Sequence, residues 1–236
     1  NLNTTCGTEG RLREYNQYGL ETRLNWETAL FGAQTSVETG VRWHTERQNR
    51  LQINADTPNG RTPGVSVNGG VPERQRRYAE AWSGFVTGQI DFGPFALSPG
   101  VRVESIEYER VNLLTGVNGK TELTEIIPGL GATFDLNNDL VVYAGVHRGF
   151  APPRVEDVIT NVGGLVDLGA EESVNWELGL RGTLTPGVDI DVATFRMDFE
   201  NQIVPASVAG GVGATLTSAG ETRHAGAEAS LRQAHG

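Results

Sequence analysis

The stretch Glu172–Leu184, ESVNWELGLRGTL, alternates strictly between apolar and polar side chains. One face carries Val174, Trp176, Leu178, Leu180 and Leu184, and the opposite face carries Ser173, Asn175, Glu177, Arg181 and Thr183. A period of two residues is the signature of a β-strand with one apolar and one polar face. Both a membrane-spanning barrel and a soluble sandwich produce this pattern, so the other segments must distinguish them.

The same alternation recurs along the chain and predicts about nine strands. They lie near residues 17–26, 37–46, 78–90, 101–104, 125–134, 140–149, 172–184, 189–204 and 218–231. The eighth of these segments changes parity, because apolar residues are even-numbered up to Val192 and odd-numbered from Phe195 onward. A β-bulge near Ala193–Thr194 would put both sets on one face, since one extra residue exchanges the faces of a strand.

Short and long connections alternate between these segments. Short turns are expected near residues 29–32, 92–95, 135–139 and 185–187, and long loops over 47–76, 112–121, 151–172 and 205–217. In an up-and-down antiparallel sheet, this alternation places every short turn at one rim and every long loop at the other. Outer-membrane barrels have the same asymmetry.

Three features favour a barrel over a sandwich. Many segments run to 12 or more residues, against the usual five or six in soluble sheets. The polar faces carry charges of both signs, as a watery lumen allows. Aromatic residues cluster near the segment ends, as two girdles would: Trp26, Phe31, Phe92, Phe95 and Phe134 near the short turns, and Trp43, Tyr78 and Tyr108 near the long loops.

The predicted fold is therefore all-β: a transmembrane antiparallel up-and-down β-barrel. Bacterial barrels close with an even number of strands, so about nine strands are expected to form part of a larger barrel. Barrels of about 22 strands are transporters whose lumen is plugged, and that size is the one we expect.

Composition agrees with a barrel and excludes several classes. The 236 residues are 38% hydrophobic and contain no apolar run of 18 residues, so no transmembrane helix is expected. A net charge of −10 argues against a nucleic-acid partner. Cys6 is the only cysteine, which leaves no disulfide and no cysteine-based metal site within these residues.

Four sequence blocks resemble TonB-dependent outer-membrane receptors. They are YAGVHRGFAPPRVEDV at Tyr143–Val158, EESVNWELGLRG at Glu171–Gly182, FRMDFENQIV at Phe195–Val204 and TSAGETRHAGAE at Thr217–Glu228. They resemble, in family order, the strand ending in R-G-F-x-x-P, the E-x-S-x-x-x-E-x-G strand, the strand ending in N-Q-I and the strand with a G-x-E ending. Arg13–Tyr15 and GLETRL at Gly19–Leu24 are similar to the ferric-dicitrate subgroup.

The resemblance implies a function as well as a fold. It implies that residues 1–236 are part of the receptor barrel domain, with the plug domain absent from these residues. The intact receptor would lie in the outer membrane of a Gram-negative-type bacterium and take up a ferric chelate, either ferric citrate or a siderophore. Energy would come from the TonB complex acting through the plug region. The implied partners also include outer-membrane lipid and lipopolysaccharide, and iron would enter only within the bound chelate, with no cofactor.

Candidate substrate-binding residues come mainly from a basic island. Residues 47–77 contain six arginines but only two acidic residues, Asp56 and Glu73. Guanidinium groups form bidentate bonds to carboxylates. Next to the YAGVHRGF block, His147 and Arg154 could also meet a ligand. The predicted substrate-binding residues are Arg50, Arg61, Arg74, Arg76, Arg77, His147 and Arg154. The same arginines could instead bind lipopolysaccharide phosphates or remain solvated.

Alternatives to active uptake remain open. A passive porin or another barrel without TonB coupling would show the same alternation, and a soluble β-sandwich would share part of it. An enzyme is not expected, because we find no nucleophile motif, zinc motif, Rossmann fingerprint or phosphate-binding loop. His44 shares a strand face with Glu38 and Glu46, but neighbours on one strand face are about 6–7 Å apart, which is wide for a shared metal ion.

Overall fold

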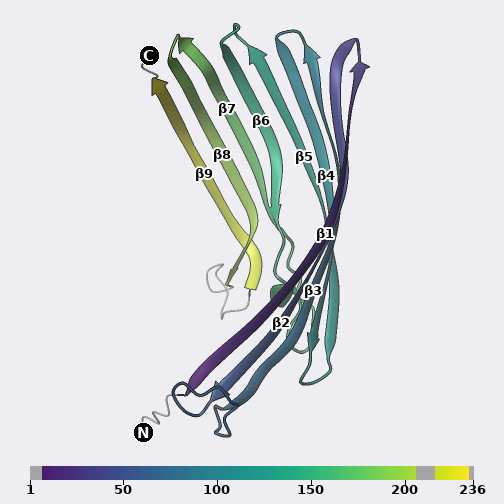
Figure 1. Ribbon diagram of the computed structural model, residues 1–236, viewed down its shortest axis with the longest axis vertical. Helices are drawn as coiled ribbons and strands as arrows, with labels where there is room; N and C mark the ends of the chain where they lie inside the picture. The colour runs from purple at the N-terminus through teal and green to yellow at the C-terminus, as the bar shows by residue number, and fades with distance from the viewer. Residues whose placement is uncertain (1–6, 206–215, 234–236) are drawn as a thin grey trace.

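The computed structural model describes residues 7–205 and 216–233, which form one antiparallel sheet of nine strands in sequence order (Figure 1). The strands are β1 (Thr8–Leu30), β2 (Ala33–Ala55), β3 (Gly70–Phe92), β4 (Phe95–Asn112), β5 (Asn118–Asp135), β6 (Leu140–Ala151), β7 (Glu171–Thr185), β8 (Val188–Pro205) and β9 (Leu216–Gln233), with one short helix, α1 (Val155–Val158). The predicted strand number and up-and-down order are confirmed. No helix in the described ranges is long and apolar enough to span a membrane.

The four short turns lie at one end of the sheet, the upper end in Figure 1, and the connections 56–69, 113–117 and 152–170 lie at the other. Most of the fourth predicted long loop, 205–217, lies outside the described residues. Between β1 and β2 the turn has positive φ at both central residues, 53° at Phe31 and 80° at Gly32. This is the backbone of a type I′ turn, which matches the twist of the two strands that it joins. The predicted segregation of short turns from long connections is therefore correct.

The first long connection is shorter than predicted. It spans residues 56–69 instead of 47–76, because β2 and β3 remain paired out to Gln52 and Glu73. The backbone ladder continues where nearly all side chains except Leu51 are polar, so the alternation that marks a strand is lost. At the tip, the Asp56 carboxylate accepts a hydrogen bond from the Val65 amide at 2.6 Å and bonds Ser66. The second connection is likewise only residues 113–117.

The sheet has two chemically different faces. We define the inner face as the one that residues 152–170 cover, and the outer face as its opposite. Trp176 and Leu178 lie on the outer face with exposed fractions of 52% and 56%, whereas Ser173 on the inner face is buried. The predicted parity of β7 is therefore the observed one, and the apolar side chains point away from the covered side of the sheet.

Three aromatic side chains fix the register on the inner face. Phe85 lies directly across from Gly40, Tyr143 across from Gly179, and Phe195 across from Gly226. A Cβ atom on Gly40 would lie 2.6 Å from the Phe85 ring, and the other two pairs are as close. Each ring therefore covers a glycine whose replacement by a larger residue would force the ring to move, which favours this pairing of the two strands.

The predicted bulge in β8 is wrong. Strands β7 and β8 stay in register from Asp189 to Glu200, and the irregularity in their pairing lies at Thr183–Thr185. Phe195 therefore points to the inner face, where it covers Gly226. The parity change in the sequence has a different cause. Near the turn the apolar side chains of β8 lie on the outer face, and farther along its aromatic side chains lie on the inner face, so no extra residue is inserted.

Aromatic side chains bound the apolar part of the outer face. Phe92, Phe95 and Phe134 lie side by side across three strands near the short turns. Ten residues along β3 from Phe92, the Trp82 ring packs on Trp43 with 6.4 Å between ring centroids. Ten tilted strand residues span about 25 Å, the height of the apolar band of an outer-membrane barrel.

Tyr108 does not belong to this girdle, contrary to expectation. It points to the inner face and is buried, with an exposed fraction of 5%. Its even-numbered position on β4 places it beside Ile106 rather than beside outward-facing Val103.

These two faces predict a different loss of stability for an arginine introduced on each of them. In the full-length protein in bilayers, Leu178→Arg should lower the free energy of unfolding by about 2–4 kcal/mol, because it places a cation in hydrocarbon. Its neighbour Glu177 lies on the opposite face, so Glu177→Arg is the matched control and should cost much less. Equal destabilisation of both variants, measured by denaturant unfolding, would contradict the assignment of the faces.

Candidate functional site

The connection between β6 and β7 folds back over the inner face of β3 to β5. It begins with Pro152-Pro153, which fix the backbone as it leaves β6. It then forms α1 and a bridge between Ile159 and Leu165. Its apolar side chains complete a small core with the sheet: Ile106, Tyr108, Val158, Ile159 and Leu168. Ile159 is fully buried, so apolar contact anchors this connection to the sheet.

Polar side chains from two strands hold the same connection. The Arg110 guanidinium on β4 donates to the Ile159 carbonyl at 2.5 Å. The amide of Asn161 accepts from Gln75 of β3 at 2.5 Å and from Asn112 of β4 at 3.1 Å. The buried Ile159 carbonyl thereby has the partner that buried polar groups require, and the Asn161 side chain is also satisfied by sheet residues.

Next to this core, two carboxylates join two arginines. Glu156 of α1 lies 2.7 Å from Arg77 of β3 and 3.4 Å from Arg50 of β2. Glu73 lies 3.4 Å from the same Arg77 and 3.2 Å from the same Arg50. The helix of the connection is thus tied to the strands by shared ion pairs.

These charges are largely removed from solvent. The side chain of Arg77 is 4% exposed and that of Arg50 is 15% exposed. Burial lowers the pKa of the Arg77 guanidinium, while Glu156 opposes that effect. Burial would raise the pKa of Glu156, but a backbone N–H and the arginines Arg77, Arg154 and Arg50 hold it below its ordinary value. Glu156 is therefore ionised, and its charge stabilises the buried arginines.

The cluster contains more cationic than anionic groups. The guanidinium groups of Arg50 and Arg77 share the two carboxylates Glu73 and Glu156, and a third guanidinium, that of Arg110, bonds Gln75 and the Ile159 carbonyl instead. Within residues 7–205 and 216–233, the Arg77 Nε atom and the Tyr108 hydroxyl are buried without a hydrogen-bond partner. Burial also raises the pKa of Tyr108 to about 12, which keeps this hydroxyl protonated. Donors without acceptors and an excess of positive charge suit an oxyanion.

A cavity of about 560 Å³ opens beside this cluster on the inner face. Its walls come from β1 to β4, from the end of β6 and from the start of the connection. The polar and charged residues among its lining are Arg13, Tyr15, His44, Glu46, Gln48, Arg50, Arg77, Tyr78, Glu104, Tyr108, Arg154 and Glu156. Such a volume is that of a small-molecule site, and four of these side chains are arginines.

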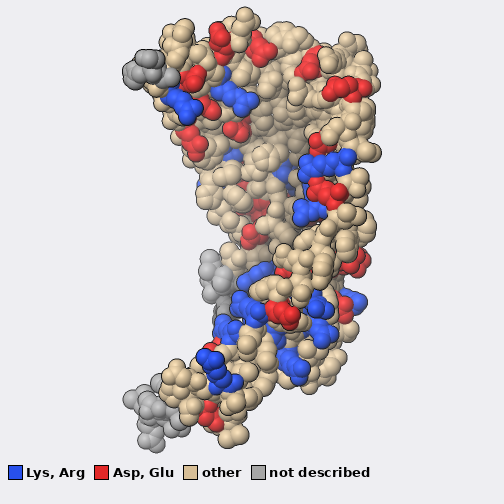
Figure 2. All heavy atoms as spheres, in the orientation of Figure 1, with Lys and Arg blue, Asp and Glu red and all other residues tan. Residues whose placement is uncertain are grey.

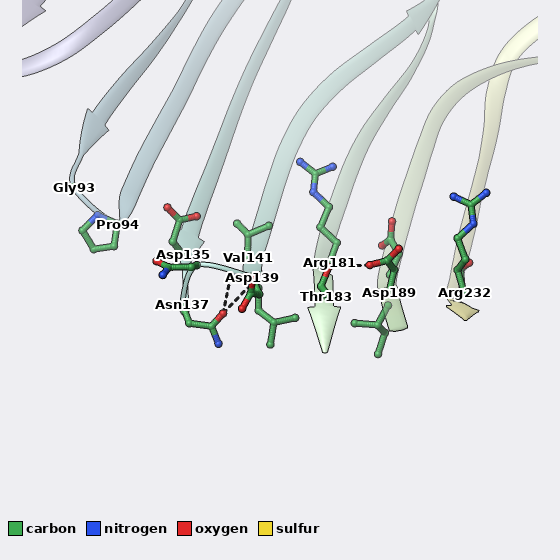
Figure 3. Close-up of a pocket in the computed structure, with 16 residues that line it drawn as sticks. Gly93, Pro94, Asp135, Asn137, Asp139, Val141, Arg181, Thr183, Asp189 and Arg232 are labelled. Atoms are coloured by element: carbon green, nitrogen blue, oxygen red, sulfur yellow. Dashed lines mark hydrogen bonds between the residues drawn. The ribbon is translucent and has the colours of Figure 1, made fainter. Parts of the chain in front are cut away.

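A second cavity lies at the short-turn rim, where Figure 3 shows its polar side chains. Its volume is about 1190 Å³, and Asp135, Asp139, Asp189 and Asp191 outnumber Arg181 and Arg232 in its lining. Figure 2 shows a dense group of basic side chains in the other half of the molecule, which holds the long connections. The sign of the charge therefore favours the cavity beside Arg77 as an anion site.

The structure separates the arginines of the predicted basic island. Arg50 and Arg77 lie on the inner face and line the cavity. Arg74 and Arg76 have the opposite parity on β3 and are exposed on the outer face. Arg61 is exposed in the connection 56–69. Sequence spacing identified the island but did not show which members converge.

The remaining candidates also separate. Arg154 lines the cavity and is 70% exposed, and its guanidinium bonds Asp157 at 2.8 and 3.0 Å. His147 is exposed on the inner face of β6, outside the cavity lining. Sequence reasoning missed Arg13, Glu73, Arg110 and Glu156. Their parity would have placed the three strand residues on the inner face, but the contacts of Glu156 depend on the folded connection.

A family model described as TonB-dependent receptor-like β-barrel matches residues 2–234. Among solved structures, the chain is similar to the ferric citrate transporter FecA in its unliganded form, at 24% identity and a TM-score of 0.79, over 95% of this chain and 33% of that one. It is also similar to the siderophore receptor PiuA from Acinetobacter baumannii, at 15% identity and a TM-score of 0.72, over 94% of this chain and 36% of that one. The chain spans about a third of the length of these proteins.

The buried cluster predicts that substitutions at two adjacent arginines, Arg76 and Arg77, differ strongly in their effect on stability. Arg77→Ala should lower the free energy of unfolding of the full-length protein by about 3 kcal/mol, because it leaves buried carboxylates short of a cation. The value is at the low end of the range for a broken buried pair, since Arg50 still contacts both carboxylates. Arg76→Ala on the outer face is the control, with an expected change within about 0.5 kcal/mol. Comparable unfolding midpoints for the two variants in detergent would refute the cluster's structural role.

Proposed function

The chain belongs to the TonB-dependent receptor β-barrel family, and on that premise we propose that the whole protein is an outer-membrane receptor for a carboxylate-rich ferric chelate. Iron would be the cargo, held by the chelate and not by protein ligands. The TonB complex would supply energy through a plug region that is not among these residues. The chelate-binding site would lie on the inner face of the sheet.

The observation that carries the proposal is the arginine-lined cavity at the end of the long connections. Arg13, Arg50, Arg77 and Arg154 line one space of about 560 Å³. Ferric citrate presents several carboxylates around the metal, and a guanidinium matches a carboxylate with two parallel hydrogen bonds. The similarity to a ferric citrate transporter supports the same ligand class.

The outer face fits the proposed location. Beyond Trp43 and Trp82 it turns from apolar to basic at Arg47, Arg74 and Arg76, which are exposed there. Arginines next to an aromatic girdle lie at the depth of lipid headgroups. We propose that these outer arginines contact phosphates of lipopolysaccharide, while the inner arginines serve the chelate.

Ligand binding by the full-length receptor tests the assignment of the two sets. Arg13→Gln combined with Arg50→Gln should weaken binding of ferric citrate by at least about tenfold, since each charge-assisted bond contributes about 1.5–3 kcal/mol. Arg74→Gln combined with Arg76→Gln removes two charges of the same island from the opposite face and should leave affinity unchanged. Isothermal titration calorimetry in detergent measures both.

Two results would overturn the proposal. A loss of affinity in the outer-face variant equal to that in the inner-face variant would exclude the cavity as the ligand-binding site. A wild-type receptor that binds neither ferric citrate nor a siderophore, yet conducts ions steadily in planar bilayers, would favour the passive porin instead.

A further inference from the structure

The carboxylate of Glu156 occupies arginines that a chelate would use. It comes from the protein's own connection between β6 and β7, and it lies 2.7 Å from Arg77 and 3.4 Å from Arg50. Both arginines line the proposed ligand cavity. The contact has the chemistry expected of a ligand carboxylate, a charge-assisted bond to one guanidinium with a second guanidinium nearby.

We propose that Glu156 is a built-in competitor that determines which ligands reach Arg50 and Arg77. A chelate would gain these arginines only by replacing the carboxylate of Glu156 with one of its own. This inference rests on the proposed function and adds a specificity-determining residue to the same site.

Exchange is possible because Glu156 is the more accessible partner. Its side chain is 27% exposed, whereas that of Arg77 is 4% exposed. It is carried by a helix of four residues, while the buried side chains of Val158, Ile159 and Leu168 anchor the connection farther along. Glu156 can therefore leave the arginines without removal of the anchor from the sheet.

The same burial makes the exchange selective. A ligand without negative charge that displaced Glu156 would leave the Arg77 guanidinium buried with Glu73 as its remaining ion-pair partner. Breaking a buried pair in this way is strongly unfavourable. A ligand that brings a carboxylate restores the pair, and one with additional oxygen atoms offers acceptors for Arg77 Nε and the Tyr108 hydroxyl. Neutral chelates therefore leave Glu156 in place.

Removing the competitor tests the idea. Glu156→Gln in the full-length receptor should bind ferric citrate at least about fivefold more tightly, because the arginines no longer have to be vacated before binding. Affinity for a neutral ferric hydroxamate should stay unchanged, since that ligand does not compete with Glu156. Asp167→Asn is the matched control: it removes an exposed carboxylate from the same connection, outside the cavity lining, and it should leave both affinities as in wild type.

Calorimetry distinguishes this inference from the function on which it rests. If wild type binds ferric citrate and Glu156→Gln binds it no more tightly, the proposal that Glu156 competes with the ligand is overturned and the receptor function stands. A gain of equal size for the neutral hydroxamate would also overturn it, because it would reflect a loosened connection and not a freed charge. Absence of ferric citrate binding in both forms would overturn the function and this inference together.

Hydrogen exchange of the wild-type receptor provides a readout that needs no variant. Saturating ferric citrate should speed amide exchange at residues 155–159, because Glu156 no longer ties α1 to the strands. A neutral ferric hydroxamate should not. Unchanged or slower exchange with ferric citrate would show that the ligand leaves Glu156 bound to its arginines, contrary to the proposal.

Discussion

The cross-strand backbone ladder is the constraint on which the rest of this structure depends. Each strand pairs with its sequence neighbours over most of its length, so the face on which a side chain lies follows from its parity alone. That rule puts Trp82 and Leu178 outside and Arg77 inside. Because the ladder continues beyond the apolar band, the same strands that form this band also carry charged residues toward the long connections.

The connection between β6 and β7 offsets the cost of burying arginines on the inner face. Arginines on β2 to β4 would be costly to bury alone, and Glu73 compensates only part of their charge. Glu156 supplies a second carboxylate, and Ile159 of the same connection packs in the apolar core with Ile106 and Tyr108. The cluster remains short of acceptors at Arg77 and Tyr108, which is why it suits an anion better than a closed ion-pair network would.

The sequence predicted the fold in some detail because its main signal is local. Alternation in ESVNWELGLRGTL and similar segments gave nine strands, their order and the rim of each turn, all observed. The predictions that failed did so where alternation is weak or has two explanations. β2 and β3 extend through largely polar residues that resemble a loop, and in β8 the two apolar sets lie on opposite faces with no bulge between them.

What the sequence determined by itself is the strand pattern, the two faces and the presence of an arginine-rich island, because each depends on residues close together in the chain. Which of these arginines meet depends on how the sheet and the β6–β7 connection pack together. Adjacent Arg76 and Arg77 differ because a strand sends neighbours to opposite faces. Glu156 reaches Arg77 from 79 positions farther along the chain because apolar residues of its own connection dock on β4, and no local pattern encodes a contact over that separation.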